Sequence, residues 1–262
     1  MKKLNLIFVT VLCLIFGITA VVSAQGFYVG LGYEDLSNDL TIKVPDLANL
    51  KIDLNTPCKL YTADLGYEFN QNYTIEANYS WGTTDLAGLK INPYPGETIE
   101  ADLDEDNSIF SVEGRGKFQV AKSFYLTGII GYAEYKTTAS GTLDLSWVSS
   151  DYSADIKQTI KGAYLGAGVS YQPIDRLELG ATYRQMIDPS GSLRLDLNDA
   201  KYDSTHLHDL DYSALEIYTK VNINQNWTAI AQYTKAMTDY SVSGADVSCD
   251  TSGLTVKCQY KF

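Results

Sequence analysis

The last nine residues, LTVKCQYKF (254–262), alternate strictly between two kinds of side chain and stop on an aromatic residue. The apolar or aromatic set is Leu254, Val256, Cys258, Tyr260 and Phe262, and the polar set is Thr255, Lys257, Gln259 and Lys261. A two-residue period predicts a β-strand with one face in an apolar environment and one in a polar environment. The rest of the sequence decides whether a protein core or a lipid bilayer meets the apolar face.

The start of the chain indicates a secretory signal peptide. Two lysines precede an unbroken apolar run, and small residues precede Gln25. We expect cleavage after Ala24, which makes 1–24 the signal peptide and 25–262 one exported domain. An uncleaved anchor is disfavoured because a cleavage site follows at once and no second apolar run of about 18 residues occurs later.

The composition is acidic. The chain has 20 Lys and Arg residues against 32 Asp and Glu residues, and loss of the signal peptide with its two lysines takes the net charge from −12 to −14. Such a chain would be repelled by the phosphate backbone, so we expect no nucleic-acid partner.

Ten stretches with a two-residue period follow the signal peptide, and no segment shows a helical period. Their connections alternate in length. The short ones are 70–72, 119–123, 172–175 and 224–226, and the long ones lie near 36–57, 84–107, 137–159, 188–211 and 241–251. Short turns at one end and long loops at the other are typical of barrels in bacterial outer membranes, where the short turns are periplasmic. The predicted fold class is therefore all-β, an antiparallel up-and-down transmembrane barrel of ten strands.

The alternation continues into several of the long loops, as at 142–148 and 192–199, which predicts tall hairpins beyond the membrane. In NYTIEANYSW (72–81) the lipid-facing set would be Tyr73, Ile75, Ala77, Tyr79 and Trp81. Aromatic residues at both ends of this set suit the two membrane borders, as do the 20 tyrosines of the chain. A soluble lipocalin-like barrel with its apolar face inward is the alternative.

The second face carries the charges that we assign to the lumen. It has seven acids and seven bases, namely Glu34, Asp64, Glu68, Glu76, Glu113, Glu178, Glu216, Arg115, Lys117, Arg176, Arg184, Lys220, Lys257 and Lys261. Unpaired charges are costly in an interior, so we expect ion pairs among Glu76, Glu113, Arg115, Glu178, Arg184, Glu216, Lys220 and Lys257. A barrel of this size has little spare room, which favours a plugged lumen over a general diffusion pore.

The net negative charge lies mainly in two external loops. Loop 84–107 has seven acids and one lysine, and loop 188–211 has six acids against Arg194 and Lys201. These loops would repel anionic lipid phosphates unless cations intervene.

The stretch DLDEDNSIFSVE (102–113) has the spacing of a calcium-binding loop. Asp102, Asp104, Asp106 and Glu113 occupy its first, third, fifth and twelfth positions. The helices that usually flank such a loop are missing, and a solvated acidic loop that enters a strand is the alternative. No other cofactor is indicated.

The only two histidines, His206 and His208, stand in THLHDLDY (205–212) beside Asp209 and Asp211. A His–Asp pair can orient a general base, and Asp85 is expected at the outer end of another strand. A polar loop without chemistry is the alternative, because no Ser or Cys nucleophile is placed to complete the set.

Three cysteines would remain after signal cleavage, which permits at most one internal disulfide. Cys58 and Cys249 are expected at the outer ends of the second and tenth strands, which flank the first in a closed barrel. They are the candidate pair. Cys258 would face lipid as an unpaired apolar residue.

The stretch AYLGAGVSYQPIDRLELGATYRQ (163–185), a strand, a short turn and a strand, resembles the omptin-like superfamily of ten-stranded outer-membrane barrels. Omptins are surface proteases with acidic pairs and a His–Asp pair at the barrel rim. Here the stretch after Gln185 has Asp188 but no histidine before 206, and Asp85 lacks a second acid. The resemblance therefore implies architecture and membrane location, and the catalytic motifs are not matched.

The closing strand also resembles the C-terminal signature by which the barrel-assembly machinery recognises outer-membrane barrels. Leu254, Val256, Tyr260 and Phe262 would be this assembly signal.

We therefore hypothesise a non-enzymatic integral outer-membrane protein whose acidic external loops serve surface interaction, adhesion or envelope integrity. Its partners would be outer-membrane lipid, lipopolysaccharide, the barrel-assembly machinery and an unidentified extracellular ligand. The alternatives are a divergent omptin-like surface protease and a narrow porin-like channel for small solutes.

Overall fold

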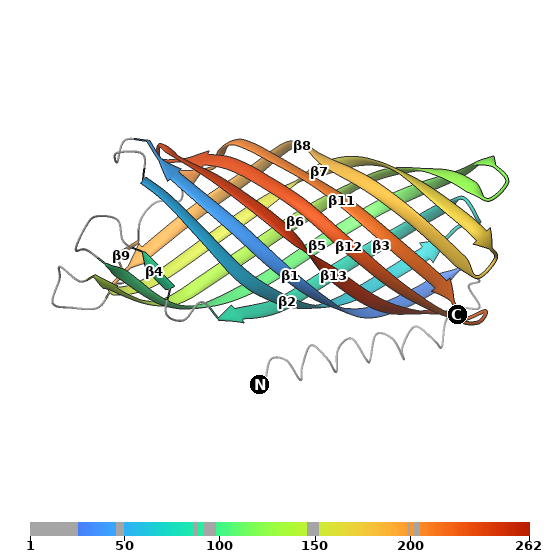
Figure 1. Cartoon of the computed structure of the whole chain (residues 1–262), viewed down its shortest axis with the longest axis horizontal. Coiled ribbons are helices and arrows are strands. Elements are labelled where there is room, and N and C mark those ends of the chain that lie inside the picture. The colour runs from blue at the N-terminus through green and yellow to red at the C-terminus, as the bar shows by residue number, and fades with distance from the viewer. Residues whose placement is uncertain are drawn as a thin grey trace.

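The computed structural model describes residues 26–45, 50–85, 89–91, 98–145, 152–198, 200–201 and 205–262. They form one antiparallel sheet closed into a barrel, which confirms the predicted fold class (Figure 1). The long strands are β1 (Phe27–Val44), β2 (Leu50–Glu68), β3 (Tyr73–Asp85), β5 (Ile99–Ala121), β6 (Phe124–Leu145), β7 (Tyr152–Ile174), β8 (Leu177–Leu197), β11 (His208–Asn222), β12 (Trp227–Val242) and β13 (Ala245–Lys261). Three short strands are β4 (Leu89–Ile91), β9 (Ala200–Lys201) and β10 (Thr205–His206).

The ten long strands follow one another around the wall in chain order. β13 pairs with β1, and β7 pairs with β8, so the sheet has no free long edge. Closure satisfies the backbone donors and acceptors that an open sheet would leave unpaired in lipid. No helix in the described part of the chain is long and apolar enough to cross a membrane.

The short turns lie at the end of the barrel that holds the C-terminus, and β4 and β9 lie at the other end (Figure 1). Two of these turns share the sequence NQN and the same hydrogen bonds. The side-chain oxygen of Asn70 accepts from the backbone N–H groups of Asn72 and Tyr73 at 2.8 and 3.1 Å, and Asn224 does the same two and three residues further on. The asparagine thus replaces a backbone acceptor and closes each turn.

The polarity of the outward and inward faces of the barrel wall is reversed along the tall strands. In β1 the outward side chains change from Leu31 and Tyr33 to the exposed Asp35, while the inward ones change from Glu34 to the buried Leu36. The same change occurs in β5, where the outward side chains are Phe110 and Phe118 below and Asp102, Asp104 and Asp106 above. The lower half is apolar outside and polar inside, so lipid surrounds it, whereas water surrounds the upper half.

Aromatic side chains mark both borders of the apolar band. On one side, Tyr33, Tyr61 and Trp81 contact one another across three strands, with ring centroids 5.8 and 6.2 Å apart. At the periplasmic end, the ring contacts join Phe27, Phe262, Tyr260 and Trp227. We take the membrane-spanning segments as the strand residues between these two girdles.

The strands continue well beyond the outer girdle, through residues that were expected to be loops. Residues 36–44, 50–57, 99–107 and 245–251 are all strand. Tall hairpins were predicted for several long loops, with 142–148 and 192–199 as examples, and their described residues 142–145 and 192–197 are strand. In the tall hairpins the inward residues are the apolar ones, as in the buried cluster of Ala101, Leu103, Ala139 and Ala154.

The ladder between β8 and β11 is interrupted above the pair Gln185–Ser213. Pro189 has no N–H to donate, and Asp188 and Asp209 both have positive φ, at 48° and 51°. Beyond this interruption β8 pairs with β10 in place of β11.

Candidate functional site

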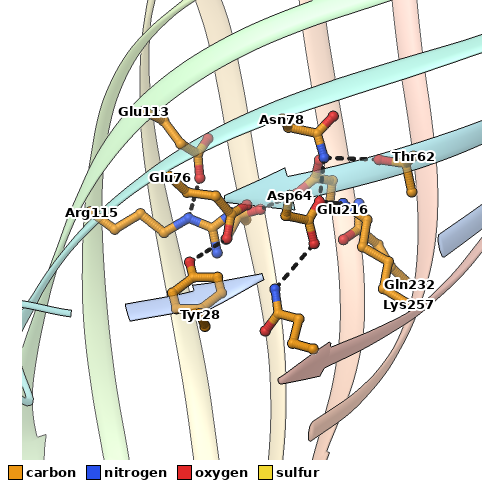
Figure 2. A network of polar contacts seen from close by, with 12 residues as sticks. Tyr28, Thr62, Asp64, Glu76, Asn78, Glu113, Arg115, Glu216, Gln232 and Lys257 are labelled. Atoms are coloured by element: carbon orange, nitrogen blue, oxygen red, sulfur yellow. Dashed lines mark hydrogen bonds and ion pairs between the residues drawn. The ribbon is translucent and has the colours of Figure 1, made fainter. Parts of the chain in front are cut away.

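The lumen contains two cavities, of about 370 and 210 Å3. Five side chains line both cavities and therefore lie in the layer between them: Glu76, Arg115, Glu216, Gln232 and Lys257. We call this layer, together with its partners Asp64, Glu113 and Arg184, the septum. Figure 2 labels all of these residues except Arg184. The cavity on the side of the tall hairpins is the outer cavity, and the other is the periplasmic cavity.

Two arginines and three glutamates form the centre of the septum. Arg184 contacts Glu113 at 3.2 Å between Nη2 and Oε2, and it donates to Glu216. Arg115 donates to Glu113 and lies 3.9 Å from Glu76. Glu113 is therefore shared by both arginines, and only 6% of its side chain is exposed.

Asp64 is the second centre of the septum and has no exposed side-chain surface. Its Oδ1 accepts from Lys257 Nζ at 3.0 Å and from Asn78 Nδ2 at 2.6 Å, and its Oδ2 accepts from Gln259 Nε2 at 3.2 Å. These donors come from β13 and β3, on either side of the pair β1 and β2. A buried carboxylate with three donors is compensated for the loss of water.

Two septum carboxylates each accept a hydrogen bond from a tyrosine that lies opposite a glycine. Tyr28 lies directly opposite Gly66 and donates to Glu76 at 2.5 Å. Tyr164 lies opposite Gly131 and donates to Glu113 at 2.8 Å. In both cases the ring lies over the glycine. A Cβ at Gly66 or Gly131 would come within 2.2 or 2.4 Å of the ring, so only glycine leaves room for it.

Sequence reasoning missed this role of tyrosine, because the tyrosines were assigned to the membrane borders. Tyr218 makes the same arrangement with Gly180 and donates to Glu178 at 3.0 Å. The signal was present in the sequence, since these tyrosines stand in the polar set of their strands and not in the apolar set.

The periplasmic cavity contains the other predicted lumen charges. Lys117 contacts Glu178 at 2.8 Å, and Lys261 contacts Glu68. Lys220 lies opposite Glu178 in the ladder, without an ion pair within 4 Å among the described residues. Seven of the eight residues that were predicted to pair are in ion pairs, all but Lys220. Five of them pair with one another, whereas Glu178 pairs with Lys117 and Lys257 pairs with Asp64.

The stretch predicted as a calcium loop is a straight part of β5. Asp102, Asp104 and Asp106 are exposed on the outward face, whereas Glu113 is on the lumen face and belongs to the septum. The four carboxylates do not converge, which corrects the expectation of a loop. Among the described residues no group of three or more His, Cys, Asp or Glu side chains could hold a metal ion.

The candidate disulfide is not formed, since Cys58 and Cys249 are both free. They lie opposite Leu36 and Leu40 of the intervening strand β1, which places them about 13 Å apart along the strands. A disulfide needs Cα atoms within about 7 Å. Burial raises the pKa of the Cys58 thiol to about 11, so this thiol is protonated at neutral pH. Cys258 is exposed on the lipid-facing side, as predicted.

The rim residues considered for catalysis are not assembled. His206 and His208 are exposed on either side of Leu207, which is buried in the lumen. Asp209 is exposed where the ladder is interrupted, and Asp211 accepts from Gln185 at 3.2 Å.

Asp85 ends β3, which lies five strands from β11 in the ten-strand wall. Strands about 4.8 Å apart give such a barrel a diameter of about 15 Å or more, well beyond one bridging water. The signal peptide and its cleavage after Ala24 lie outside the described residues.

The fold and its girdles define the class of protein, a β-barrel integral to a lipid membrane. The chain belongs to the family described as outer membrane protein beta-barrel domain, whose model matches residues 8–208. This family implies a bacterial outer membrane. No curated protein matches the chain.

Solved structures resemble the fold at low sequence identity. The outer membrane protease OmpT from Escherichia coli is 16% identical, with a TM-score of 0.67, over 92% of this chain and 98% of that one. The translocator domain of the autotransporter NalP from Neisseria meningitidis is 12% identical, with a TM-score of 0.45, over 94% and 92%. The toluene transporter TodX from Pseudomonas putida is 10% identical, with a TM-score of 0.37, over 92% and 90%. At these identities the likeness concerns the fold alone.

Proposed function

We propose that this barrel has no through-channel and acts at the cell surface, where the acidic outward face of its tall hairpins binds a cationic partner. The observation that carries the proposal is the row of Asp102, Asp104 and Asp106. All three are exposed on one face of β5, above the outer girdle. No base lies within ion-pair distance of them among the described residues.

The height of this row supports a role in contact with other surfaces. Alternate residues of a strand are about 6.6 Å apart, so the row spans about 13 Å. Phe110 pairs with Tyr79 near the outer girdle, and Asp106 and Asp102 lie four and eight residues above it. These separations are about 13 and 26 Å along the strand, which a tilt of about 40° converts to rises of roughly 10 and 20 Å. The row therefore begins near the lipid headgroups and rises above them.

A binding experiment tests the proposal on the full-length mature protein in phosphatidylcholine nanodiscs. The probe is a decalysine peptide, measured by biolayer interferometry at 50 and 200 mM salt. We expect binding that weakens with salt, and a further loss of about tenfold in the triple variant Asp102→Asn, Asp104→Asn, Asp106→Asn.

The matched control removes three exposed acids from the opposite wall, as Asp209→Asn, Asp211→Asn and Asp239→Asn. We expect a smaller effect in this variant. Equal losses in both triple variants would mean that net charge alone drives binding, and an unchanged affinity in the first would remove the β5 face from the interaction.

A further inference from the structure

The charges around the outer cavity do not balance. The septum has four acids, Asp64, Glu76, Glu113 and Glu216, against three bases, Arg115, Arg184 and Lys257. Two more carboxylates line the same cavity, those of Glu34 and Glu105. The remaining base, Lys136, is paired with Glu134 at 2.9 Å. Six carboxylates thus face three cations.

Glu34 and Glu105 have hydrogen bonds but no cation. Ser80 donates to Glu34 at 3.0 Å, and the amide of Asn107 donates to Glu105. No base lies within 4 Å of either carboxylate among the described residues, and the ammonium group of Lys257 is already bound by Asp64. Burial raises the pKa of Glu105, because a desolvated carboxylate without a counter-ion is destabilised in its charged form.

The two carboxylates flank one part of the wall. Besides burial, Glu105 and Glu34 both raise the pKa of the Cys58 thiol, and Cys58 is on β2, which lies between their strands β5 and β1. Thr84 lies opposite Glu105 in the ladder and is 5% exposed, so Glu105 stands in a buried part of the wall.

Apolar and aromatic side chains line the outer cavity beside uncharged polar ones such as Asn38, Ser111 and Gln158. The tilted rings of Tyr135 and Tyr212 have centroids 5.1 Å apart, and their hydroxyls bond to each other at 2.7 Å, so the rings remain as lining. Leucine and isoleucine side chains also line it, at Leu36, Leu40, Leu60, Ile109 and Ile160. The volume of about 370 Å3 lies within the range of small-molecule sites.

We propose that the outer cavity binds a primary ammonium ion that carries a short apolar chain. The ammonium group lies between Glu34 and Glu105 and replaces the missing counter-charge, and the chain lies against the tyrosines and leucines. A hydrogen-bonded carboxylate and an aromatic lining both favour ammonium groups. This site uses the inner face of the barrel, so it can fail or hold independently of the proposed surface role.

Isothermal titration calorimetry on the mature protein in phosphatidylcholine nanodiscs tests the proposal. The probe is n-hexylamine hydrochloride, with n-hexanol and sodium hexanoate as neutral and anionic analogues and empty nanodiscs to subtract lipid partition. We expect saturable one-to-one binding of the amine only. Glu34→Gln and Glu105→Gln should each weaken it by about tenfold.

Asp35→Asn is the matched control, because it removes an exposed carboxylate next to Glu34 on the outward face of β1. It should leave the affinity unchanged, and heat-modifiable migration should show that all variants fold. Equal binding of hexanol and hexylamine to the unaltered protein would overturn the proposal, even if a variant failed to fold. So would equal effects of Glu34→Gln and Asp35→Asn.

Discussion

Replacement of Glu113 by alanine is expected to lower the free energy of unfolding by about 3 to 5 kcal/mol. Glu113 is the shared partner of Arg115 and Arg184 and is 6% exposed. Its removal leaves two buried guanidinium groups with less counter-charge and Tyr164 without its acceptor. Urea unfolding of the protein refolded into liposomes measures the change.

Asp104→Asn serves as the control for this effect, because its exposed carboxylate lies on the outward face of the same strand. Its effect should stay within about 0.5 kcal/mol. A double variant in which Arg184 and Glu113 both become apolar should lose less stability than the two single variants combined. Equal unfolding midpoints for Glu113→Ala and Asp104→Asn would contradict the septum as a stabilising network.

After deletion of Phe262, we expect most of the exported protein not to assemble into a barrel in the outer membrane. The N–H of Phe262 donates to the carbonyl of Phe27 at 3.0 Å, and its ring contacts Phe27 and Tyr260. The residue therefore joins the last strand to the first at the periplasmic girdle, and the terminal aromatic resembles the assembly signature. The fraction of heat-modifiable protein in outer-membrane extracts measures the loss.

Phe262→Tyr keeps both the ring and the backbone bond, so it should assemble like the unaltered protein. The amount of exported protein, followed with an N-terminal epitope, should not change in either variant. An unchanged heat-modifiable fraction after the deletion would show that the terminal residue has no part in assembly.

Much of the fold could be predicted because lipid imposes one pattern on every strand. Outward residues such as Ile75 and Tyr79 must be apolar, and closure follows from the cost of an open edge. Above the outer girdle the pattern inverts, since water lies outside and the apolar residues Leu36 and Leu103 face inward. The two-residue period continues into the tall hairpins, but it no longer tells which face meets lipid.

The lumen charges could be predicted as a set, but their pairing could not. Arg184 on β8 reaches Glu113 on β5, three strands away, and no local sequence spacing encodes this contact. The calcium pattern failed for a related reason. Its first and last positions are 11 residues apart, and in a strand an odd separation puts Asp102 and Glu113 on opposite faces.

Single-channel conductance in planar bilayers tests the closed lumen most directly. The septum separates the two cavities with paired side chains from both halves of the wall (Figure 2). We predict no sustained openings for the unaltered protein in about 1 M KCl, where the Debye length is about 3 Å. The variant Glu76→Ala, Arg115→Ala, which removes one acid and one base from the septum, should show stepwise openings. Sustained openings of similar size in the unaltered protein would contradict the account.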